Sequence, residues 1–380
     1  MSFSSQTSSL LLPYLPTGCA EGDLSVQVDD IGSTESDTEN LLQAHLLDVA
    51  HGNCTLLRDA ELTVVVDAAR GEVLVEALEQ IGNRHIHHLV LSHADKDHIA
   101  GAVALLGNSD FTVGTIWYNA DATKDTDTWE DLGSLVFELV EAGKLKAPSA
   151  INTGCGDALS VGRLGISVLH PDVHWAIRGP HRNRRTGEVR TSNTLSVVLR
   201  VSLDGTPAVL LPGDLDAPGL RRLLTLNRDL SAPVLVFPHH GGGSGEDPRV
   251  FTRELCEAVS PDVVIFSHGR SMYNNPRPEI VSQLREQVDN VRIVCTQLSK
   301  HCRDGRAALI PPDGQMYLST LPAAGREVNA SCAGSVTVTL DEDKGIAIDP
   351  PPLGHDSFIK EYAKDALCRR LLPIIPSQRA

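Results

Sequence analysis

The chain has 380 residues, of which 41% are hydrophobic and 22% are charged, a normal balance for a globular protein. The sequence contains no apolar run of about 18 residues, so it predicts no membrane-spanning helix and no membrane partner. The net charge of −16 argues against indiscriminate binding to polyanions. The eight cysteines are scattered, which favours a reducing cytoplasm over a secreted disulfide scaffold.

The chain divides into three predicted segments. Residues 1–40 are rich in Ser, Thr, Asp and Glu, which is typical of a flexible acidic leader. Residues 41–320 are predicted to form the main domain, and residues 321–380 a C-terminal extension. In this extension, 335–350 is predicted to form a β-hairpin and 355–373 an amphipathic helix. Together they offer a docking surface for a protein partner.

Within the main domain, short apolar runs alternate with helix-like segments. The segments at 71–82, 129–145 and 277–288 carry helical signals. The runs between them are apolar for four to six residues, as strands buried on both faces should be. This alternation predicts an α/β protein with helices over sheets.

Metal-ligand residue types follow the ends of several apolar runs. They are Asp67 after "LTVVV", His93 after "IHHLVLS", Asp214 after "PAVLLPG", His239 and His240 after "APVLVFP", and His268 after "DVVIFS". If those strands lie side by side, their ends converge on one edge of a sheet. Because several strands place metal-ligand residue types at the same edge, the sequence predicts a single metal site there.

The densest cluster of such residues is the stretch "VLSHADKDHIAGA". Imidazoles and carboxylates are ligands for divalent ions such as Zn²⁺ and Mn²⁺. His93 and Asp95 can serve one ion. Asp97 and His98 can serve a second ion, and Asp214 is the natural carboxylate between the two. The alternative for this stretch is a polar helix cap.

Other strand-end residues have more than one interpretation. One histidine of the pair His239 and His240 is expected to bind the second ion, and the other to be a structural or substrate-facing neighbour. We favour His239 as the ligand because it lies nearer the strand end. Asp67 is expected to orient the metal loop by hydrogen bonds rather than to bind an ion. His268 either contacts substrate or is a core histidine.

The pattern H-x-D-x-D-H after a strand resembles the signature of the metallo-β-lactamase superfamily. The wider order, from Asp67 through the signature to Asp214 and a later histidine, matches as well. More specifically, residues 44–320 are similar to the hydrolase domain of ComEC-type competence proteins. The stretches that carry this likeness are "LLDVAHGNCTLL", "SHADKDHIAG", "VLHPD", "NTLSVVL", "LLPGD" and "HHGGGS".

The resemblance implies an αββα sandwich with one or two ions, Zn²⁺ or Mn²⁺, at one edge. It also implies a hydroxide nucleophile and phosphodiester hydrolysis, and we predict Asp97 and Asp214 as the catalytic carboxylates. Two positions depart from the superfamily pattern. Asn193 stands where many members supply a histidine to the first metal, and His170 competes with it for that place. Asn275 replaces a histidine that assists substrate or leaving group.

An arginine-rich stretch, "IRGPHRNRRTGEVR", lies shortly before Asn193 and should form a loop near the metal edge. Its residues Arg182, Arg184 and Arg185 suit recognition of the phosphates that flank a scissile bond. The alternative is an ordinary solvated loop.

Three cysteines lie near the junction with the C-terminal extension. Cys295, Cys302 and Cys332 can form a structural zinc site with His301 or Cys155 as the fourth ligand, although their spacing is wider than usual. The alternative is a set of buried thiols without a metal.

The sequence thus predicts a cytoplasmic, metal-dependent hydrolase, a phosphodiesterase or nuclease acting on nucleic acid or a nucleotide. One rival is a hydrolase of the same fold for a thioester, lactone or lactam. The other rival is a metal-poor binding module in a bacterial defence or DNA-processing system.

Overall fold

The computed structural model describes residues 42–369, apart from positions 120, 122, 183, 186, 188, 204, 271–272, 304–309, 311 and 342–344. The predicted acidic leader, residues 1–40, lies outside the described residues. The described residues belong to one compact unit. The C-terminal extension expected from residue 321 onward is therefore built into the same unit as the main domain.

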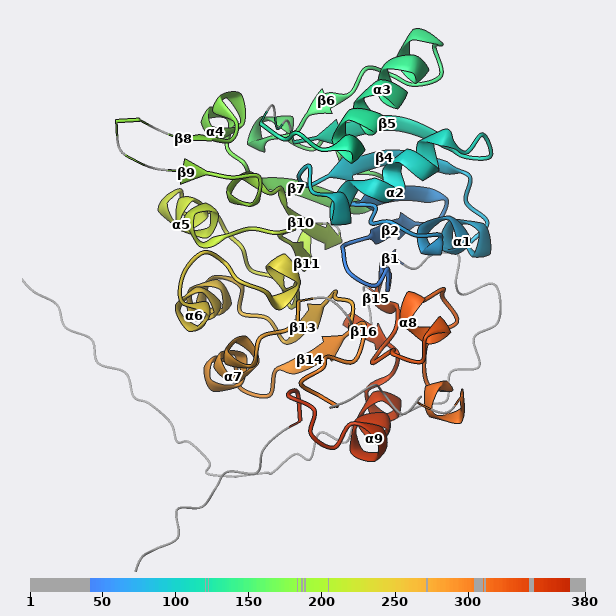
Figure 1. The fold of residues 1–380 in the computed structure, drawn as a ribbon, viewed down its shortest axis with the longest axis vertical. Coiled ribbons are helices and arrows are strands. Elements are labelled where there is room, and N and C mark those ends of the chain that lie inside the picture. Colours follow the sequence, from blue (N-terminus) through green and yellow to red (C-terminus); the bar gives the residue numbers. More distant parts are fainter. Residues whose placement is uncertain are drawn as a thin grey trace, which may run out of the picture. The chain divides into compact units, whose positions relative to one another are not determined.

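An eight-stranded sheet forms one layer of this unit (Figure 1). In spatial order its strands are β16 (Gly345–Asp349), β15 (Val336–Asp341), β1 (Leu42–Leu46), β2 (Thr55–Asp59), β3 (Leu62–Val66), β4 (His85–Leu91), β5 (Thr112–Tyr118) and β6 (Ser149–Ala150). Pairing is antiparallel from β16 to β3 and parallel from β3 to β6. The predicted hairpin at 335–350 is confirmed, and it widens this sheet beside β1.

A six-stranded sheet forms the second layer. Its strands are β14 (Arg292–Cys295), β13 (Val263–Phe266), β12 (Val234–Val236), β11 (Thr206–Leu211), β10 (Val198–Leu203) and β7 (Leu164–His170). Pairing is parallel from β14 to β11 and antiparallel from β11 to β7. A separate two-stranded ribbon joins β8 (His181–Arg182) and β9 (Val189–Arg190).

The two sheets face each other across an apolar core. Leu57 and Val64, which are paired across the first sheet, pack in one cluster with Leu199 and Val209 of the second sheet. All four side chains are fully buried. Buried side chains from the inner faces of two sheets form the core of such a sandwich.

Helices cover the outer faces of both sheets. The first sheet packs against α1 (Val73–Gln80), α2 (Lys96–Gly107) and α3 (Asp127–Glu141). The second packs against α5 (Ala217–Thr225), α6 (Pro248–Val259), α7 (Pro278–Gln287) and α9 (Pro352–Tyr362). The shorter elements are α4 (Val173–Arg178), α8 (Ala324–Glu327), η2 (Thr153–Cys155), η3 (Asn193–Leu195), η4 (Pro238–Gly241) and η5 (Pro312–Gln315). The predicted αββα sandwich is confirmed.

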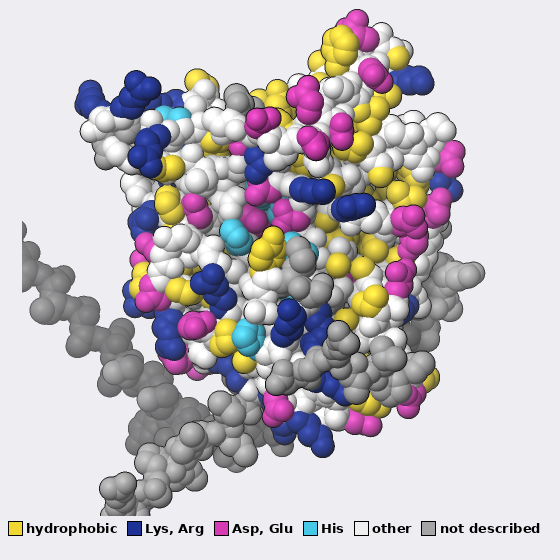
Figure 2. All heavy atoms as spheres, in the orientation of Figure 1, with side chains coloured by type: hydrophobic (Ala, Val, Ile, Leu, Met, Phe, Trp, Pro, Cys, Tyr) yellow, Lys and Arg dark blue, Asp and Glu magenta, His cyan; other side chains and the backbone are white. Residues whose placement is uncertain are grey.

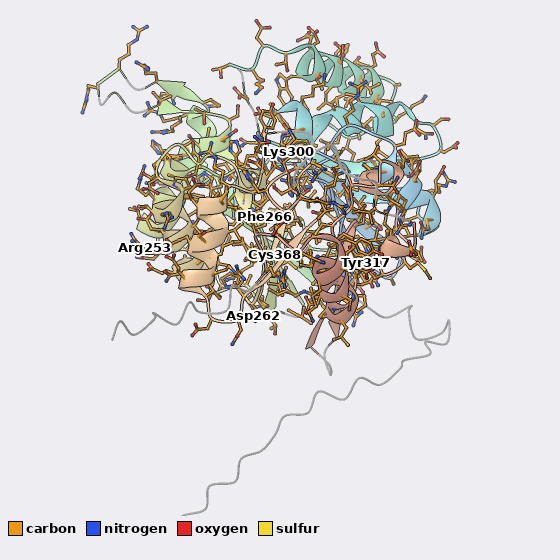
Figure 3. The ribbon with its side chains drawn as sticks, turned by 60° about the horizontal axis from the view of Figure 1, so that its bottom comes forward. Arg253, Asp262, Phe266, Lys300, Tyr317 and Cys368 are labelled. Atoms are coloured by element: carbon orange, nitrogen blue, oxygen red, sulfur yellow. The ribbon has the colours of Figure 1, made fainter. Side chains whose placement is uncertain are left out.

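The C-terminal helix α9 begins and ends earlier than the predicted segment 355–373. It starts at Pro352, because a proline in the first helical turn needs no backbone N–H partner. Phe358 and Ile359 of this helix are buried, which fits the predicted amphipathic character. The Phe358 ring lies 5.0 Å from the ring of Tyr317, which Figure 3 labels beside this helix.

A buried carboxylate, Asp48, ties the C-terminal extension to the loop after β1. Its Oδ1 accepts a hydrogen bond from Gln297 Nε2 at 2.8 Å, and its Oδ2 accepts one from the Gly325 backbone N–H at 2.9 Å. Burial raises the pKa of Asp48 to about 6. The extension is thus anchored by polar contacts as well as by sheet pairing.

In the part of the chain that the structure describes, no helix combines the length and the apolar character that a bilayer crossing requires.

Candidate metal centre

Polar side chains from both sheets meet at the carboxyl ends of the parallel strands. Asp67 follows β3 and His93 lies just beyond β4, while Asp214 follows β11 and His240 lies in η4 after β12. The carboxyl ends of neighbouring parallel strands share one edge of a sheet, which is where ligands bind in open α/β sheets. Figure 2 shows acidic and histidine side chains gathered near the middle of one face of the molecule.

The predicted metal loop crosses from β4 into α2. Asp95 is the N-cap residue of α2 and has an extended backbone, but its side chain makes no capping hydrogen bond. Asp97 and His98 lie in the first turn of the helix. The polar helix cap therefore fails as an explanation for Asp95, whose carboxylate is turned to other partners.

Four of the predicted ligands converge closely, and we call Asp97, His98, Asp214 and His240 the second ligand set. Their ligand atoms all lie within 4.8 Å of one another. His98 Nε2 lies 3.1 Å from Asp214 Oδ1, and His240 Nε2 lies 3.5 Å from the same oxygen. His240 Nε2 is also 3.3 Å from Asp97 Oδ2. Two imidazoles and two carboxylates form a donor set that suits a divalent transition ion.

The other oxygen of Asp214 faces His93 and Asp95, which we call the first ligand set. His93 Nε2 lies 3.8 Å from Asp214 Oδ2 and 3.8 Å from Asp95 Oδ2. This arrangement is looser than that of the second set. Asp95 also forms an ion pair with Lys124, which follows β5 in the chain. Asp214 therefore stands between the two sets, as the sequence predicted.

The two neighbouring histidines of η4 take different places. His240 is buried and belongs to the second ligand set. The His239 side chain is 33% exposed, and its Nδ1 lies 4.0 Å from Asp214 Oδ2 and 3.2 Å from Asn193 Nδ2. This reverses the preference for His239 as the second-set ligand. Both residues have a left-handed backbone, with φ of 53° and 55°, so the turn directs the second histidine inward.

Hydrogen bonds from behind fix the orientation of the buried rings. His98 Nδ1 lies 2.6 Å from Asp67 Oδ2, and His240 Nδ1 donates to the Ser267 carbonyl at 2.8 Å. Asp67 also accepts from the backbone N–H and the hydroxyl of Ser92, at 2.7 and 2.8 Å. A ring whose Nδ1 donates in this way turns the lone pair of its Nε2 toward an ion. Asp67 thus occupies the orienting position expected for it.

The unpartnered atoms of the site test whether an ion fits. His93 Nε2, His98 Nε2, His240 Nε2 and Asp214 Oδ1 are buried, and none makes a well-formed hydrogen bond to any described residue. Buried polar atoms without partners are costly and rare. His98 Nε2, His240 Nε2 and Asp214 Oδ1 face one shared space, so the donor set fits a divalent ion at the second ligand set.

The charge states differ between the histidines of the site. Burial lowers the pKa of His93 to about 4, so its ring is neutral at pH 7. Burial opposes the charge of Asp214, but His98 and His240 outweigh it and hold the pKa of this carboxyl well below its usual value. Burial also disfavours a charged His98, yet Asp214 and Asp67 raise its pKa well above the ordinary range. Ion binding at His98 Nε2 therefore competes with a proton.

A sequence model of one family, described as the metallo-β-lactamase superfamily, matches residues 47–268, more than half of the chain. The chain belongs to the metallo-β-lactamase superfamily. The matched region includes every residue of both ligand sets. It ends at His268, before α7 and β14. Most members of this superfamily are hydrolases.

Two curated relatives support the ComEC-type resemblance within the superfamily. The chain is 24% identical to "ComE operon protein 3" of Bacillus subtilis (strain 168) over 229 residues, which cover 59% of this chain and 25% of that protein. It is 25% identical to "Competence protein ComA" of Neisseria gonorrhoeae over 273 residues, 70% of this chain and 32% of that protein. The matched region thus spans about a quarter to a third of each relative's length.

Among solved structures, the chain is similar to the metallo-β-lactamase fold protein YhfI from Bacillus subtilis. The two share 14% sequence identity, with 67% of this chain and 95% of that chain covered and a TM-score of 0.43.

The predicted phosphate-binding arginines lie apart from the ligand sets. Arg182, Arg184 and Arg185 are exposed on or beside the β8–β9 ribbon, which Figure 1 shows projecting next to α4. Arg190 of the same stretch is buried instead, with its guanidinium 4.4 Å from the ring centre of Trp175. The phosphate contacts of the three exposed arginines stay a prediction.

Three further candidates are buried. His268 is fully buried, which favours its interpretation as a core histidine over substrate contact. Asn275 is also buried, and its amide nitrogen lies beneath Gly242, where a Cβ would come within 3.3 Å of it. His170 Nε2 lies 2.9 Å from the Thr194 carbonyl, so this ring supports η3 and does not replace Asn193.

The described residues give the structural zinc hypothesis no support. Cys295, Cys302 and Cys332 are free and buried. Among the described residues, the only group of three or more His, Cys, Asp or Glu with ligand atoms within 4.8 Å is the second ligand set. The candidate fourth ligand His301 points elsewhere, with its Nε2 3.1 Å from the Asn274 carbonyl. The thiols pack as part of the apolar core between the second sheet and α9.

Two functional side chains escaped the sequence analysis. His51 Nε2 lies 3.3 Å from Asp97 Oδ2, and its ring centre is 4.5 Å from that of His240. Lys124 pairs with Asp95. Both residues lie in loops that follow a strand, which is the signal that identified the ligands. His51 also belongs to the stretch "LLDVAHGNCTLL" that carried the resemblance.

Proposed function

We propose that the chain is a metal-dependent phosphodiesterase that cleaves nucleic acid or a nucleotide. The observation that carries the proposal is the second ligand set, where buried nitrogen and oxygen atoms face one space without hydrogen-bond partners among the described residues. Membership of a superfamily made up mostly of hydrolases supports it. The two curated relatives are both competence proteins, which supports nucleic acid as the substrate class.

The residues of the site have different roles that follow from their positions. Asp97, His98, Asp214 and His240 would hold the ion. A divalent ion such as Zn²⁺ or Mn²⁺ supplies Lewis-acid activation of water and of a phosphoryl oxygen. The Asp97 side chain is 26% exposed and lies at the open side of the set, where substrate arrives.

Two further groups would contact the substrate. The His51 side chain is 12% exposed and lies beside Asp97, where its Nε2 can hold a proton near the leaving oxygen. Arg182, Arg184 and Arg185 would hold flanking phosphates from the β8–β9 ribbon. The proposal places the reaction in the cytoplasm, where the free thiols of the described cysteines stay reduced.

The direct test is hydrolysis by the purified full chain with Mn²⁺, Mg²⁺ or Zn²⁺. The substrates are single- and double-stranded DNA, RNA and bis(p-nitrophenyl) phosphate, set beside a panel of lactones and thioesters. We expect diester cleavage that disappears in the Asp97→Ala variant. Equal product from wild type and variant would indicate contamination and refute the proposal. Turnover of a lactone or thioester without diester cleavage would favour the rival hydrolase instead.

A further inference from the structure

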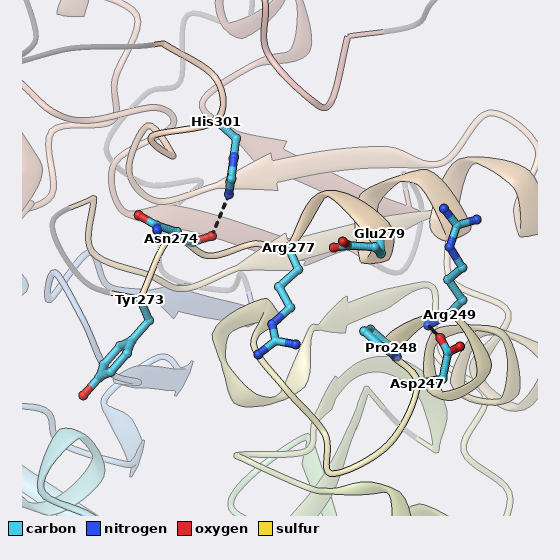
Figure 4. Close-up of a pocket in the computed structure, with 8 residues that line it drawn as sticks. All are labelled: Asp247, Pro248, Arg249, Tyr273, Asn274, Arg277, Glu279 and His301. Atoms are coloured by element: carbon cyan, nitrogen blue, oxygen red, sulfur yellow. Dashed lines mark hydrogen bonds between the residues drawn. The ribbon is translucent and has the colours of Figure 1, made fainter.

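A groove of about 630 Å³ lies beside the metal centre and contains none of its ligands. Its lining comes from the loop before α6, from α6 itself, from the segment that leads into α7 and the first turn of α7, and from the loop after β14 (Figure 4). The lining residues are Asp247, Pro248, Arg249, Tyr273, Asn274, Arg277, Glu279 and His301. The inference drawn from this groove rests on the proposed phosphodiesterase function.

One end of the groove reaches the metal centre through a chain of rings. The Tyr273 ring centre lies 4.8 Å from that of His51, and His51 Nε2 lies 3.3 Å from Asp97 Oδ2. A molecule in the groove is therefore continuous with whatever group lies at the second ligand set.

Tyr273 presents an aromatic ring to solvent at this end. The residue is 72% exposed, although a large aromatic side chain normally gains from burial. Its backbone φ of 49° is left-handed, which is unfavourable for a bulky residue. Strain of this kind persists at ligand-binding sites, where the surrounding structure holds it. An exposed ring in this position is a platform on which a nucleic-acid base can stack.

Arg277 lies in the middle of the groove and is held from the metal side. Its backbone N–H donates to the Gly241 carbonyl at 3.0 Å, in the turn that carries His240. Its guanidinium lies against Gly243, where a Cβ would come within 2.9 Å of the Arg277 Nη2 atom. Arg277 itself is exposed, and it makes no ion pair with any described residue. A planar guanidinium in this state suits a phosphate group.

The far end of the groove limits the length of the ligand. Figure 4 shows Glu279, Arg249 and Asp247 on the side of Arg277 away from Tyr273. Two carboxylates beside one arginine do not continue a cationic track, and they would repel a further run of phosphates. The groove therefore matches one aromatic ring and one phosphate, the chemistry of a single nucleotide unit.

We propose that this groove binds the nucleotide next to the scissile phosphodiester of a single-stranded nucleic acid. Its base stacks on Tyr273 and its phosphate pairs with Arg277. Stacking requires an unpaired base, so single strands are preferred over duplexes.

The test measures binding of a fluorescein-labelled single-stranded phosphorothioate DNA to the metal-loaded full chain by fluorescence anisotropy. Phosphorothioate linkages slow cleavage during the measurement. Tyr273→Ala is expected to weaken binding about tenfold, the usual scale for one stacked base. Arg277→Gln is also expected to weaken it about tenfold. Only Arg277→Gln should reduce the slope of log affinity against log salt, by about 0.7 for one lost phosphate contact on a single strand.

Two controls separate the groove from general effects. Arg253→Gln removes an exposed arginine on α6 that pairs with Glu257 outside the groove lining, and it should leave binding and slope unchanged (Figure 3). An abasic version of the same strand should bind equally well to wild type and to Tyr273→Ala.

The inference is overturned if Tyr273→Ala and Arg277→Gln bind the strand as tightly as wild type, or if the duplex binds as well as the single strand. Cleavage of bis(p-nitrophenyl) phosphate in the same preparations reports on the proposed function separately. If the wild type cleaves the small diester and the Tyr273→Ala and Arg277→Gln variants keep full affinity for the strand, only the nucleotide-binding role of the groove is refuted. If binding depends on both residues but no diester is cleaved, only the proposed phosphodiesterase activity is refuted.

Discussion

The two ligand sets share Asp214 but are held in different ways. In the second set, His98 and His240 are fixed from behind by Asp67 and the Ser267 carbonyl, and their Nε2 atoms converge on one space. In the first set, Asp95 already pairs with the cation of Lys124. The ligands of the two sets are therefore held differently, although the same sequence signature contributes to both.

A further difference lies in the number of donors. The second set has four donors within 4.8 Å of one another. The first has three donors, His93, Asp95 and the shared Asp214, with His93 Nε2 3.8 Å from each carboxylate and Asn193 where many superfamily members supply a histidine. An amide is a weaker ligand for Zn²⁺ than an imidazole. We expect one tightly held ion per chain, at the second set.

The largest effect is expected at Asp214, where the sets meet. Asp214→Asn should lower diester turnover by at least about a thousandfold, because several kcal/mol of Lewis-acid stabilisation depends on the ion. Metal content, measured by inductively coupled plasma mass spectrometry, should fall with it. Asp216→Asn is the matched control, since Asp216 Oδ1 caps α5 through the Gly219 N–H at 3.0 Å and asparagine suits the same cap. Retention of both ion and turnover by Asp214→Asn would remove Asp214 from the centre.

The second prediction separates the sets directly. His240→Ala should weaken Mn²⁺ binding at least about a hundredfold, since losing even an outer partner of a metal ligand costs up to that much. His93→Ala should cost less than about tenfold, because the first set contributes little to the tightly held ion. Isothermal titration calorimetry measures both. Equal losses in the two variants would show that the sets bind as one unit.

The third prediction concerns the support behind the second set. Asp67→Asn removes the carboxylate that accepts from His98 Nδ1, so the ring loses its fixed orientation and tautomer. Mn²⁺ affinity should fall about tenfold to a hundredfold, while circular dichroism shows an unchanged fold. An Asp67→Asn variant with wild-type affinity would mean that ring packing alone orients His98.

The smallest effect is expected at Lys124, and it runs in the opposite direction. Lys124→Met removes the cation beside Asp95, and the carboxylate becomes available to a metal. The number of bound Mn²⁺ ions per chain should rise from one toward two in equilibrium dialysis. Asn193→His in the same background should strengthen the added site. If the wild type already holds two ions tightly, a metal displaces Lys124 from Asp95 and the prediction is wrong.

Much of this architecture could be predicted from the sequence, because the strands end in the residues that matter. Apolar runs that end at Asp67, His93 and Asp214 predicted both the sheet edge and most of the ligands. Periodicity located the helices, although α9 starts at Pro352, three residues before the predicted segment 355–373.

What the sequence could not predict depends on backbone direction and on partners far away in the chain. The choice between His239 and His240 is decided by two consecutive left-handed residues, which no hydrophobic pattern encodes. The ion pair of Lys124 with Asp95 links residues 29 positions apart. Cysteine spacing suggested a zinc site only because the direction of each thiol is invisible in the sequence.

The place of the C-terminal hairpin in the first sheet has a consequence for synthesis on the ribosome. Strand β1 pairs with β2 on one side and with β15 on the other, and His45 meets Thr337 across 292 positions of chain. While the chain is still emerging, the Leu42–Leu46 strand has one bare edge until residues 336–341 are made. An open edge of this kind invites pairing with other nascent chains. A chaperone, or slow translation that keeps neighbours apart, would therefore protect this protein until its last strands arrive.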